Sequence, residues 1–227
     1  MRENDVVKNN KKFNLNRQIT GVIQNDKIWE QWYDPAKMKE NLPKMNQADY
    51  EEECNKDYPN DVILNNRGLK KITNSEFIAM RNKYIRSLKA MGIGKGDKVV
   101  SIALSTPELI AFKYACAYVG AITAHFNFTE DKEKMYKHIK LLNPSLIMFL
   151  DILEPSISEV LNSEEFKSVK KLRLPVSAST PILNDEKLKT ALFTLNNKLQ
   201  NKNVKGAISL SKFVSYGQYY NGPMESV

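Results

Sequence analysis

Residues 88–126 read LKAMGIGKGDKVVSIALSTPELIAFKYACAYVGAITAHF, and this stretch decides the fold. Its centre, KVVSIAL (98–104), is a run of β-branched and other apolar residues that is typical of a strand buried on both faces. A largely apolar helix follows, and AITAHF (121–126) is a second strand. Because strand, helix and strand alternate with short connections, the stretch predicts parallel strands joined by right-handed crossovers.

The helix between these two strands carries clear start and stop signals. Thr106 has a side chain suited to an N-cap, and Pro107 is favoured at the first helical position. Glu108 completes an Ser-Thr-Pro-Glu helix start. Gly120 follows the last apolar residue and ends the helix.

Three alternate glycines in MGIGKGDKV (91–99) suggest a loop that binds a nucleotide phosphate. Such a loop must follow a strand and open a helix, so that the free N–H groups of the helix point at the phosphates. MGIGKGDKV has the reverse order. We therefore interpret Gly92 as the left-handed C-terminal cap of a helix, and Gly96 with Asp97 as a tight turn into the next strand.

The residues before this stretch predict a hairpin and an amphipathic helix. VILNNRGLKKIT (62–73) has turn residues at its centre, as in a β-hairpin. Thr73 and Glu76 form a T-x-x-E capping box. The helix that follows has one apolar face, made of Phe77, Met80, Tyr84, Leu88 and Met91.

The alternation continues beyond residue 126. We expect Thr129 to cap a helix that carries Met135 and Ile139, and SLIMFL (145–150) to be a third strand. Weaker signals predict a helix near 156–163, a strand in KKLRLPVS (170–177), a helix from about 185 to 199, and a turn-rich tail with one short helix. The fold class is thus α/β, with a parallel β-sheet flanked by helices and an N-terminal β-hairpin.

Composition bounds the function. The chain has 227 residues, 42% of them hydrophobic, and a net charge of +8. The basic residues are spread along the chain with acidic neighbours, which argues against nucleic-acid binding. Even the densest basic cluster, Lys170, Lys171 and Arg173, is interpreted as a solvated approach to a strand.

Cys54 and Cys116, the two cysteines, suit a reduced protein better than a disulfide scaffold or a zinc site. The start of the chain lacks the apolar segment of a signal peptide, and no run reaches the roughly 20 apolar residues that a membrane span needs. We expect a cytoplasmic protein with no membrane span.

Residues 58–151 resemble the N-terminal portion of the acyl-adenylate-forming enzymes, and of these the acyl-CoA synthetases most. The matching pieces keep their order and spacing. They are the helix start at Thr73 to Phe77, the turn at Gly92, Gly96 and Asp97, the helix start at Ser105 to Glu108, the Gly-Ala-Ile at Gly120, and Asn127 beyond the second strand.

The resemblance implies a two-step ligase. A carboxylate attacks the α-phosphate of ATP to give an acyl-adenylate and pyrophosphate, and the thiol of CoA then displaces AMP. Mg²⁺ would neutralise the phosphates. The complete enzyme would thus use ATP, Mg²⁺ and CoA, with a small carboxylic acid as substrate.

Parts of that machinery have no counterpart in this sequence. The family's phosphate loop is rich in Ser, Thr and Gly and ends in Pro-Lys-Gly. SASTP (177–181) has hydroxyls without the glycine and lysine, and SYGQ (215–218) lacks the Thr-Glu of the family's magnesium-binding motif. The later ribose-binding aspartate, the hinge and the lysine of the C-terminal domain are also missing.

We therefore expect an N-terminal arm (1–45) that docks on a partial AMP-binding domain (46–227), which lacks the phosphate loop and the C-terminal domain. Such a chain would hold no catalytic, cofactor or metal site of its own. It would need the remainder of the same ligase chain, and its exposed apolar area would favour homo-oligomers. The alternative is a non-catalytic truncated homologue that binds a partner. A complete small enzyme of unrelated chemistry has no nucleophile-base-acid motif to support it.

Polar residues at the strand ends are the candidates for a pocket, because ligands collect at the carboxyl ends of parallel strands. They are Ser105, Thr106, His125, Asn127 and Asp151. His125 is the sharpest candidate, although a lone histidine is more often a hydrogen-bonded structural residue. Glu51, Glu52 and Glu53 suggest a metal cluster, but a charged helix face is the preferred interpretation. His138 is expected to be solvated.

Overall fold

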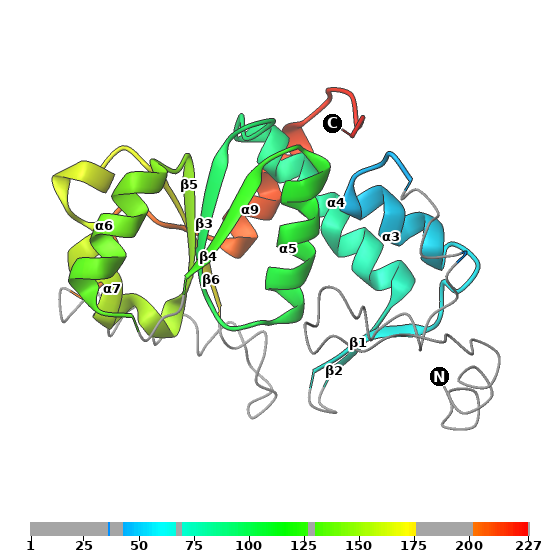
Figure 1. Ribbon diagram of the computed structural model, residues 1–227, viewed down its shortest axis with the longest axis horizontal. Helices are drawn as coiled ribbons and strands as arrows, with labels where there is room; N and C mark the ends of the chain where they lie inside the picture. Colours follow the sequence, from blue (N-terminus) through cyan, green and yellow to red (C-terminus); the bar gives the residue numbers. More distant parts are fainter. Residues whose placement is uncertain (1–35, 37–42, 67–69, 127–129, 176–201, 227) are drawn as a thin grey trace, which may run out of the picture. The chain divides into compact units, whose positions relative to one another are not determined.

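The computed structural model describes residues 36, 43–66, 70–126, 130–175 and 202–226. The chain divides into two units, Met1–Lys44 and Met45–Val227, and every element below belongs to the second. Its centre is a five-stranded sheet of order β4-β3-β5-β6-β7 (Figure 1), in which all pairs are parallel. The strands are β3 (Lys98–Ile102), β4 (Ile122–Phe126), β5 (Leu146–Leu150), β6 (Lys170–Leu174) and β7 (Ile208–Ser209).

Helices cover both faces of this sheet (Figure 1). On one face lie α4 (Asn74–Ala90), α5 (Pro107–Tyr118) and α9 (Leu210–Tyr216), whose Phe77, Phe112 and Phe213 share one apolar core. On the other lie α6 (Lys132–Leu142) and α7 (Glu154–Leu161), with a second core around Met135 and Ile139. The predicted α/β class with a helix-flanked parallel sheet is confirmed.

The position of β5 at the centre of the sheet explains why its sequence is apolar throughout. Each of its five residues is buried, since α5 and α9 lie over one face and α6 and α7 over the other. A strand enclosed in this way has no solvent face and shows no alternation in its sequence. At the sheet's edge, β4 has three exposed residues, Ile122, Thr123 and His125.

The local signals for α4 and α5 are present in the structure. Thr73 accepts a hydrogen bond from the Glu76 backbone, and the Glu76 side chain accepts one from the Thr73 backbone in return. Gly92 has φ 68°, and Ile93 N donates to Leu88 O at 2.9 Å, which stops α4. Thr106 Oγ1 accepts from Leu109 N at 3.2 Å and caps α5.

The MGIGKGDKV segment is a turn that Asp97 holds closed. One carboxylate oxygen of Asp97 accepts from Gly94 N at 2.8 Å, and the other accepts from Ser145 Oγ at 2.5 Å. The Ser145 hydroxyl and the Gly94 amide hold the pKa of Asp97 below its usual value. Because Gly94 N is bonded to Asp97, it does not point outward to a phosphate, and the structural interpretation of this segment holds.

The remaining elements match the expectations in part. The hairpin is present as β1 (Val62–Asn66) antiparallel to β2 (Lys70–Thr73). The cap of α6 is Asp131, which accepts from Glu133 N at 3.0 Å, so the assignment of that cap to Thr129 was wrong. The strand β7 was not predicted. The expected helix at 185–199, Thr129 itself and almost all of the arm 1–45 lie outside the described residues.

The described part of the second unit also contains short elements. They are α3 (Gln47–Asn55) and the 3₁₀ turns η3 (Asp151–Leu153), η4 (Glu164–Phe166) and η6 (Gly217–Tyr219). The turn η3 follows β5 directly at the carboxyl edge of the sheet, and η6 follows α9.

Candidate functional site

The carboxyl edge of the sheet brings together four of the five pocket candidates. β4, β3 and β5 are adjacent and parallel, so their carboxyl ends lie side by side. Ser105 and Thr106 follow β3, Asp151 follows β5, and His125 is the penultimate residue of β4. The fifth candidate, Asn127, lies outside the described residues.

Two of these four side chains are already occupied within the protein. Thr106 is 4% exposed and caps α5. Asp151 is 2% exposed, and its Oδ1 accepts from Ile152 N at 2.7 Å. Ser105 and His125 are exposed. Of the four described candidates, the edge therefore leaves one hydroxyl and one imidazole, those of Ser105 and His125, accessible to a ligand.

His125 is held by the neighbouring strand. Its Nδ1 lies 3.0 Å from Ser101 Oγ, directly across the β3–β4 register. Partial burial of the ring, and then the nearby Lys113 ammonium, lower the pKa of His125, so the imidazole is neutral at pH 7. Ser101 is 2% exposed, and so its hydroxyl cannot reach a substrate. The pair can orient the ring, but it is not a nucleophile and base.

A buried ion pair at the same edge was not predicted. Arg173 in β6 donates to Glu154 Oε1 of α7 at 2.5 Å, and Glu154 also accepts from Val204 N at 2.9 Å. Glu154 is fully buried and Arg173 is 9% exposed. The pair therefore connects α7, β6 and the segment that leads to β7. The available sequence signal was the position of Arg173 between two leucines of the strand KKLRL, where a charged side chain that is buried needs a partner.

The solvated interpretation of the basic cluster was therefore wrong for two of its members. Lys171 is 5% exposed, and its ammonium donates to Phe166 O at 2.6 Å and to Val169 O at 3.3 Å. Burial lowers the pKa of Lys171. Lys170 alone is exposed.

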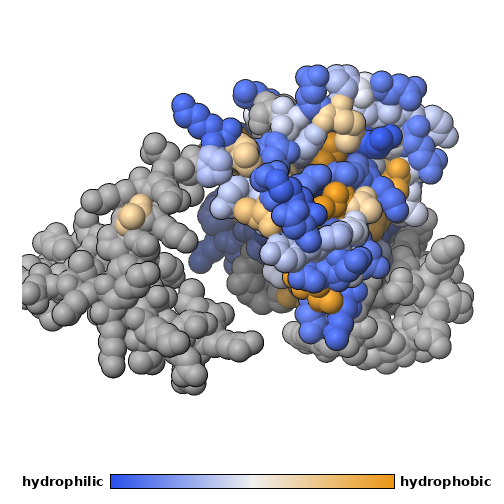
Figure 2. Space-filling model, turned by 90° about the vertical axis from the view of Figure 1, so that its right-hand side faces the viewer, coloured by the Kyte–Doolittle hydropathy of each residue, from blue (hydrophilic) through white to orange (hydrophobic). Residues whose placement is uncertain are grey.

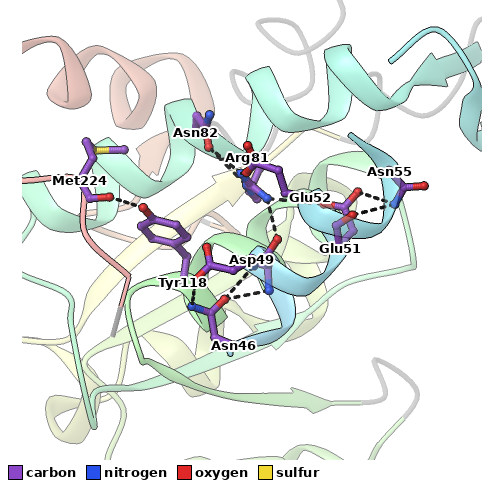
Figure 3. A network of polar contacts seen from close by, with 10 residues as sticks. Asn46, Asp49, Glu51, Glu52, Asn55, Arg81, Asn82, Tyr118 and Met224 are labelled. Carbon is purple, nitrogen blue, oxygen red and sulfur yellow. Dashed lines mark hydrogen bonds and ion pairs between the residues drawn. The ribbon is translucent and has the colours of Figure 1, made fainter. Parts of the chain in front are cut away.

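A second polar network joins α3 to α4 (Figure 3). Arg81 is 1% exposed and donates to Ala48 O at 2.9 Å, to Glu51 at 3.4 Å, and to the carboxylate of Glu52. Asn82 supplies a further acceptor, 3.1 Å from Arg81 Nη2. Desolvation raises the pKa of Glu51, and the Arg81 charge opposes that rise. The network ties α3 to the body.

Glu51, Glu52 and Glu53 lie on α3, and their carboxylates have different partners. Glu51 and Glu52 bind Arg81, whereas Glu53 pairs with Lys56 at 2.5 Å on the surface. His138 in α6 is 53% exposed, with its Nδ1 3.0 Å from Glu130. Within the described ranges, no group of three metal-ligating side chains converges.

The described residues do not fit ATP, Mg²⁺ or CoA as a complete site. Within SYGQ (215–218), Gly217 is buried and packs closely against Ser87 of α4. SYGQ also lacks the acidic residue with which the family motif holds magnesium. SASTP (177–181) lies outside the described residues.

Comparison with known families and structures identifies this arrangement. A family model described as AMP-binding enzyme matches residues 51–209, which span the hairpin, α4 and the whole sheet. The chain belongs to the AMP-binding enzyme family. The resemblance to the acyl-adenylate-forming superfamily is thereby confirmed. A search among curated proteins found no match.

Solved structures of adenylate-forming enzymes share the fold of this chain. Coronafacic acid ligase from Pectobacterium brasiliense superposes with TM-score 0.59 at 14% identity, over 81% of this chain and 31% of the ligase. A benzoate CoA ligase from Burkholderia xenovorans superposes with TM-score 0.52 at 13% identity, over 57% of this chain and 26% of the ligase. The adenylation domain of a carboxylate reductase from Mycobacterium chelonae superposes with TM-score 0.59 at 12% identity, over 82% of this chain and 31% of that domain's chain. The chain spans about a quarter to a third of these proteins.

In the parts of the chain that the structure describes, no helix is both long enough and apolar enough to cross a bilayer.

Proposed function

We propose that this chain is the N-terminal portion of an ATP-dependent, AMP-forming acyl-CoA synthetase and is not catalytically competent alone. The family match over residues 51–209 carries the proposal. The limited share of each ligase that the chain spans, 26% and 31%, supports it further. The missing phosphate-loop sequence points the same way.

In the complete enzyme, a carboxylate and ATP would form an acyl-adenylate and pyrophosphate, and CoA would then take the acyl group and release AMP. Magnesium would supply charge neutralisation at the phosphates. In this proposal residues 46–227 are a partial AMP-binding domain on which the arm 1–45 docks. This domain holds one wall of the substrate site in place, and the remainder of the chain supplies the phosphate and ribose contacts.

The carboxyl edge of the sheet is the part of this chain that we assign to that wall. Ser105 and His125 are exposed there, and His125 is oriented by Ser101 at 3.0 Å. A neutral, oriented imidazole can donate or accept one hydrogen bond, which suits positioning of a polar group better than attack on it. We further propose a cytoplasmic location, since Cys54 and Cys116 are both free thiols.

The test is carboxylate-dependent exchange of pyrophosphate into ATP, measured with a panel of aromatic and aliphatic acids. We expect the 227-residue chain to show no exchange above a no-enzyme control, because the residues that bind phosphates are missing. A chain extended to the next stop codon of the natural reading frame should catalyse the exchange of pyrophosphate into ATP. The encoded extension should contain a Ser/Thr/Gly-rich segment that ends in Pro-Lys-Gly.

Two results would overturn the proposal. Robust exchange by the 227-residue chain would show that it is a complete enzyme. A natural stop codon directly after residue 227 would favour the alternative, a non-catalytic homologue that binds a partner.

A further inference from the structure

A cavity of about 580 Å³ lies at the amino end of β6, at the opposite edge of the parallel sheet from Ser105 and His125. It opens to solvent. Three tyrosines line it, Tyr216, Tyr219 and Tyr220, which we call the tyrosine wall, and Met91, Lys89 and Lys170 also line it. Neither the sequence motifs nor the proposed ligase reaction assigns a role to this place.

The tyrosine wall is held firmly by two glycines. A Cβ at Gly217 would lie 2.9 Å from Ser87 Oγ and 3.1 Å from Ser87 N, so η6 packs directly on α4. A Cβ at Gly222 would lie 2.5 Å from the Tyr220 hydroxyl, which donates to Pro223 O at 3.1 Å. The backbone that carries these tyrosines is thus held against α4, and the Tyr220 ring is held by its own hydrogen bond, so less order has to be gained when a ligand binds.

One ring of this wall faces water. Tyr219 is 80% exposed, although an aromatic ring gains free energy when it is covered. A single exposed aromatic residue is common on protein surfaces. Tyr219 differs because it lines a cavity beside two further tyrosines and two lysines. This combination is suited to stacking on a planar ring.

The two lysines give the cavity a positive charge. Lys170 donates to Met91 O at 2.6 Å, and Lys89 donates to Pro223 O at 2.8 Å and Glu225 O at 2.9 Å. An ammonium has three N–H donors, so in the described part of the chain these bonds use one donor of Lys170 and two of Lys89. Among the described lining residues there is no carboxylate. The carboxylate of the nearby Asp97, which binds Gly94 and Ser145, also interacts with the Lys170 charge and offsets part of it, while Lys89 adds a second positive charge.

We propose that this cavity binds a planar aromatic phosphate ester, with its ring stacked on the tyrosine wall and its phosphate on Lys170 and Lys89. Base-type rings stack on tyrosine without needing specific hydrogen bonds. Phosphate oxygens accept the remaining lysine donors. A cationic ligand does not fit, because both lysines would repel it.

The test is calorimetric titration of the 227-residue chain with 4-methylumbelliferyl phosphate at low salt. We expect Lys170→Gln to weaken binding about fivefold, as for an exposed ion pair. Tyr219→Ala should weaken it roughly tenfold through lost stacking. Raising NaCl to about 0.5 M should weaken the binding of the ester, because salt screens the lysine charge.

Matched controls separate this cavity from the general charge of the surface. Lys134→Gln changes an exposed lysine on α6, and Tyr58→Ala removes a tyrosine that is 58% exposed before β1. Both controls should bind the ester as the unchanged chain does. Each variant is also checked for an unchanged thermal midpoint, so that loss of binding is not loss of folding.

The two halves of the ligand decide the chemical class. Inorganic phosphate alone and 4-methylumbelliferone alone should each bind at least tenfold more weakly than the ester. Binding of either half as tightly as the ester, equal losses in the control variants, or no binding of the ester would overturn the proposal. None of these outcomes depends on pyrophosphate exchange, so the proposed ligase function stands or falls separately.

Discussion

Arg81 is the residue on which the attachment of α3 depends. Its guanidinium is fully enclosed, and every partner described above comes from α3 or from the adjacent Asn82 (Figure 3). Removing one member of a buried ion pair leaves the other charged and desolvated, which costs more than the pair itself contributes. Glu51, at 8% exposure, would be the group left behind.

We therefore expect Arg81→Ala to lower the free energy of unfolding by about 3–5 kcal/mol. Urea denaturation followed by circular dichroism measures this change. Arg86→Ala in the same helix is the control, because Arg86 is exposed, and its effect should stay within about 0.5 kcal/mol. Equal effects of the two substitutions would contradict the role given to Arg81.

Residue roles that depend on close neighbours in sequence could be predicted, and those that depend on distant partners could not. The caps at Thr73 and Thr106 and the left-handed Gly92 follow from three or four consecutive residues. Arg173 was interpreted as a solvated charge, because its acidic partner lies 19 residues away, and no local pattern singled out Arg81, whose partner Glu51 lies 30 residues away. For the candidate site, topology could be predicted, but the occupation of Thr106 and Asp151 by internal bonds could not.

At the scale of elements, the contact between η6 and α4 depends on one glycine. The added Cβ of Gly217→Ala would meet Ser87 Oγ at 2.9 Å, and also the Ser87 backbone, which cannot rotate away. Overpacking of this kind costs about 1–3 kcal/mol. We expect Gly217→Ala to lower the thermal midpoint and to lose the ester binding proposed for the tyrosine cavity.

Gly94→Ala is the matched control for this prediction. A Cβ there meets nothing within 4 Å, and Gly94 is not among the residues with positive φ. Its midpoint should equal or slightly exceed that of the unchanged chain, since alanine reduces the entropy of the unfolded state. A larger loss for Gly94→Ala than for Gly217→Ala would reverse the assignment.

Long, patterned elements were predictable, whereas short ones that depend on pairing were not. α4, β3, α5 and β5 each carry a period or a continuous apolar run. β7 is two residues long, and Ile208 and Ser209 become a strand only because β6 lies beside them. So short a segment has no period of its own to detect.

For the whole second unit, we expect any self-association to involve the edge strand β4. Within the described residues β4 pairs with β3 alone, and Ile122 on it is 58% exposed. Its sequence, ITAHF, carries no lysine, glutamate or proline to block pairing with another strand. The face seen in Figure 2 is mostly hydrophilic and has only small, separate apolar patches, so that face offers no large apolar surface for self-association.

We expect sedimentation velocity to show concentration-dependent association of the 227-residue chain, and Ile122→Lys to reduce it at least severalfold. Leu141→Lys is the control: Leu141 is 83% exposed but lies on α6, away from any strand edge. A chain that stays monomeric at all concentrations, or an equal effect of both lysines, would contradict the role of β4.

The buried Glu154 has a consequence for how the chain can be divided. It binds Arg173 at the end of β6 and the amide of Val204, and Asn162 adds hydrogen bonds to Asn203 O at 2.9 Å and Lys205 N at 2.8 Å. These bonds join the two sides of residues 176–201 without needing the peptide chain between them. Two separate polypeptides, one ending after β6 and one starting at residue 202, therefore have the contacts to reassemble, which makes this a natural place to build a split-protein reporter.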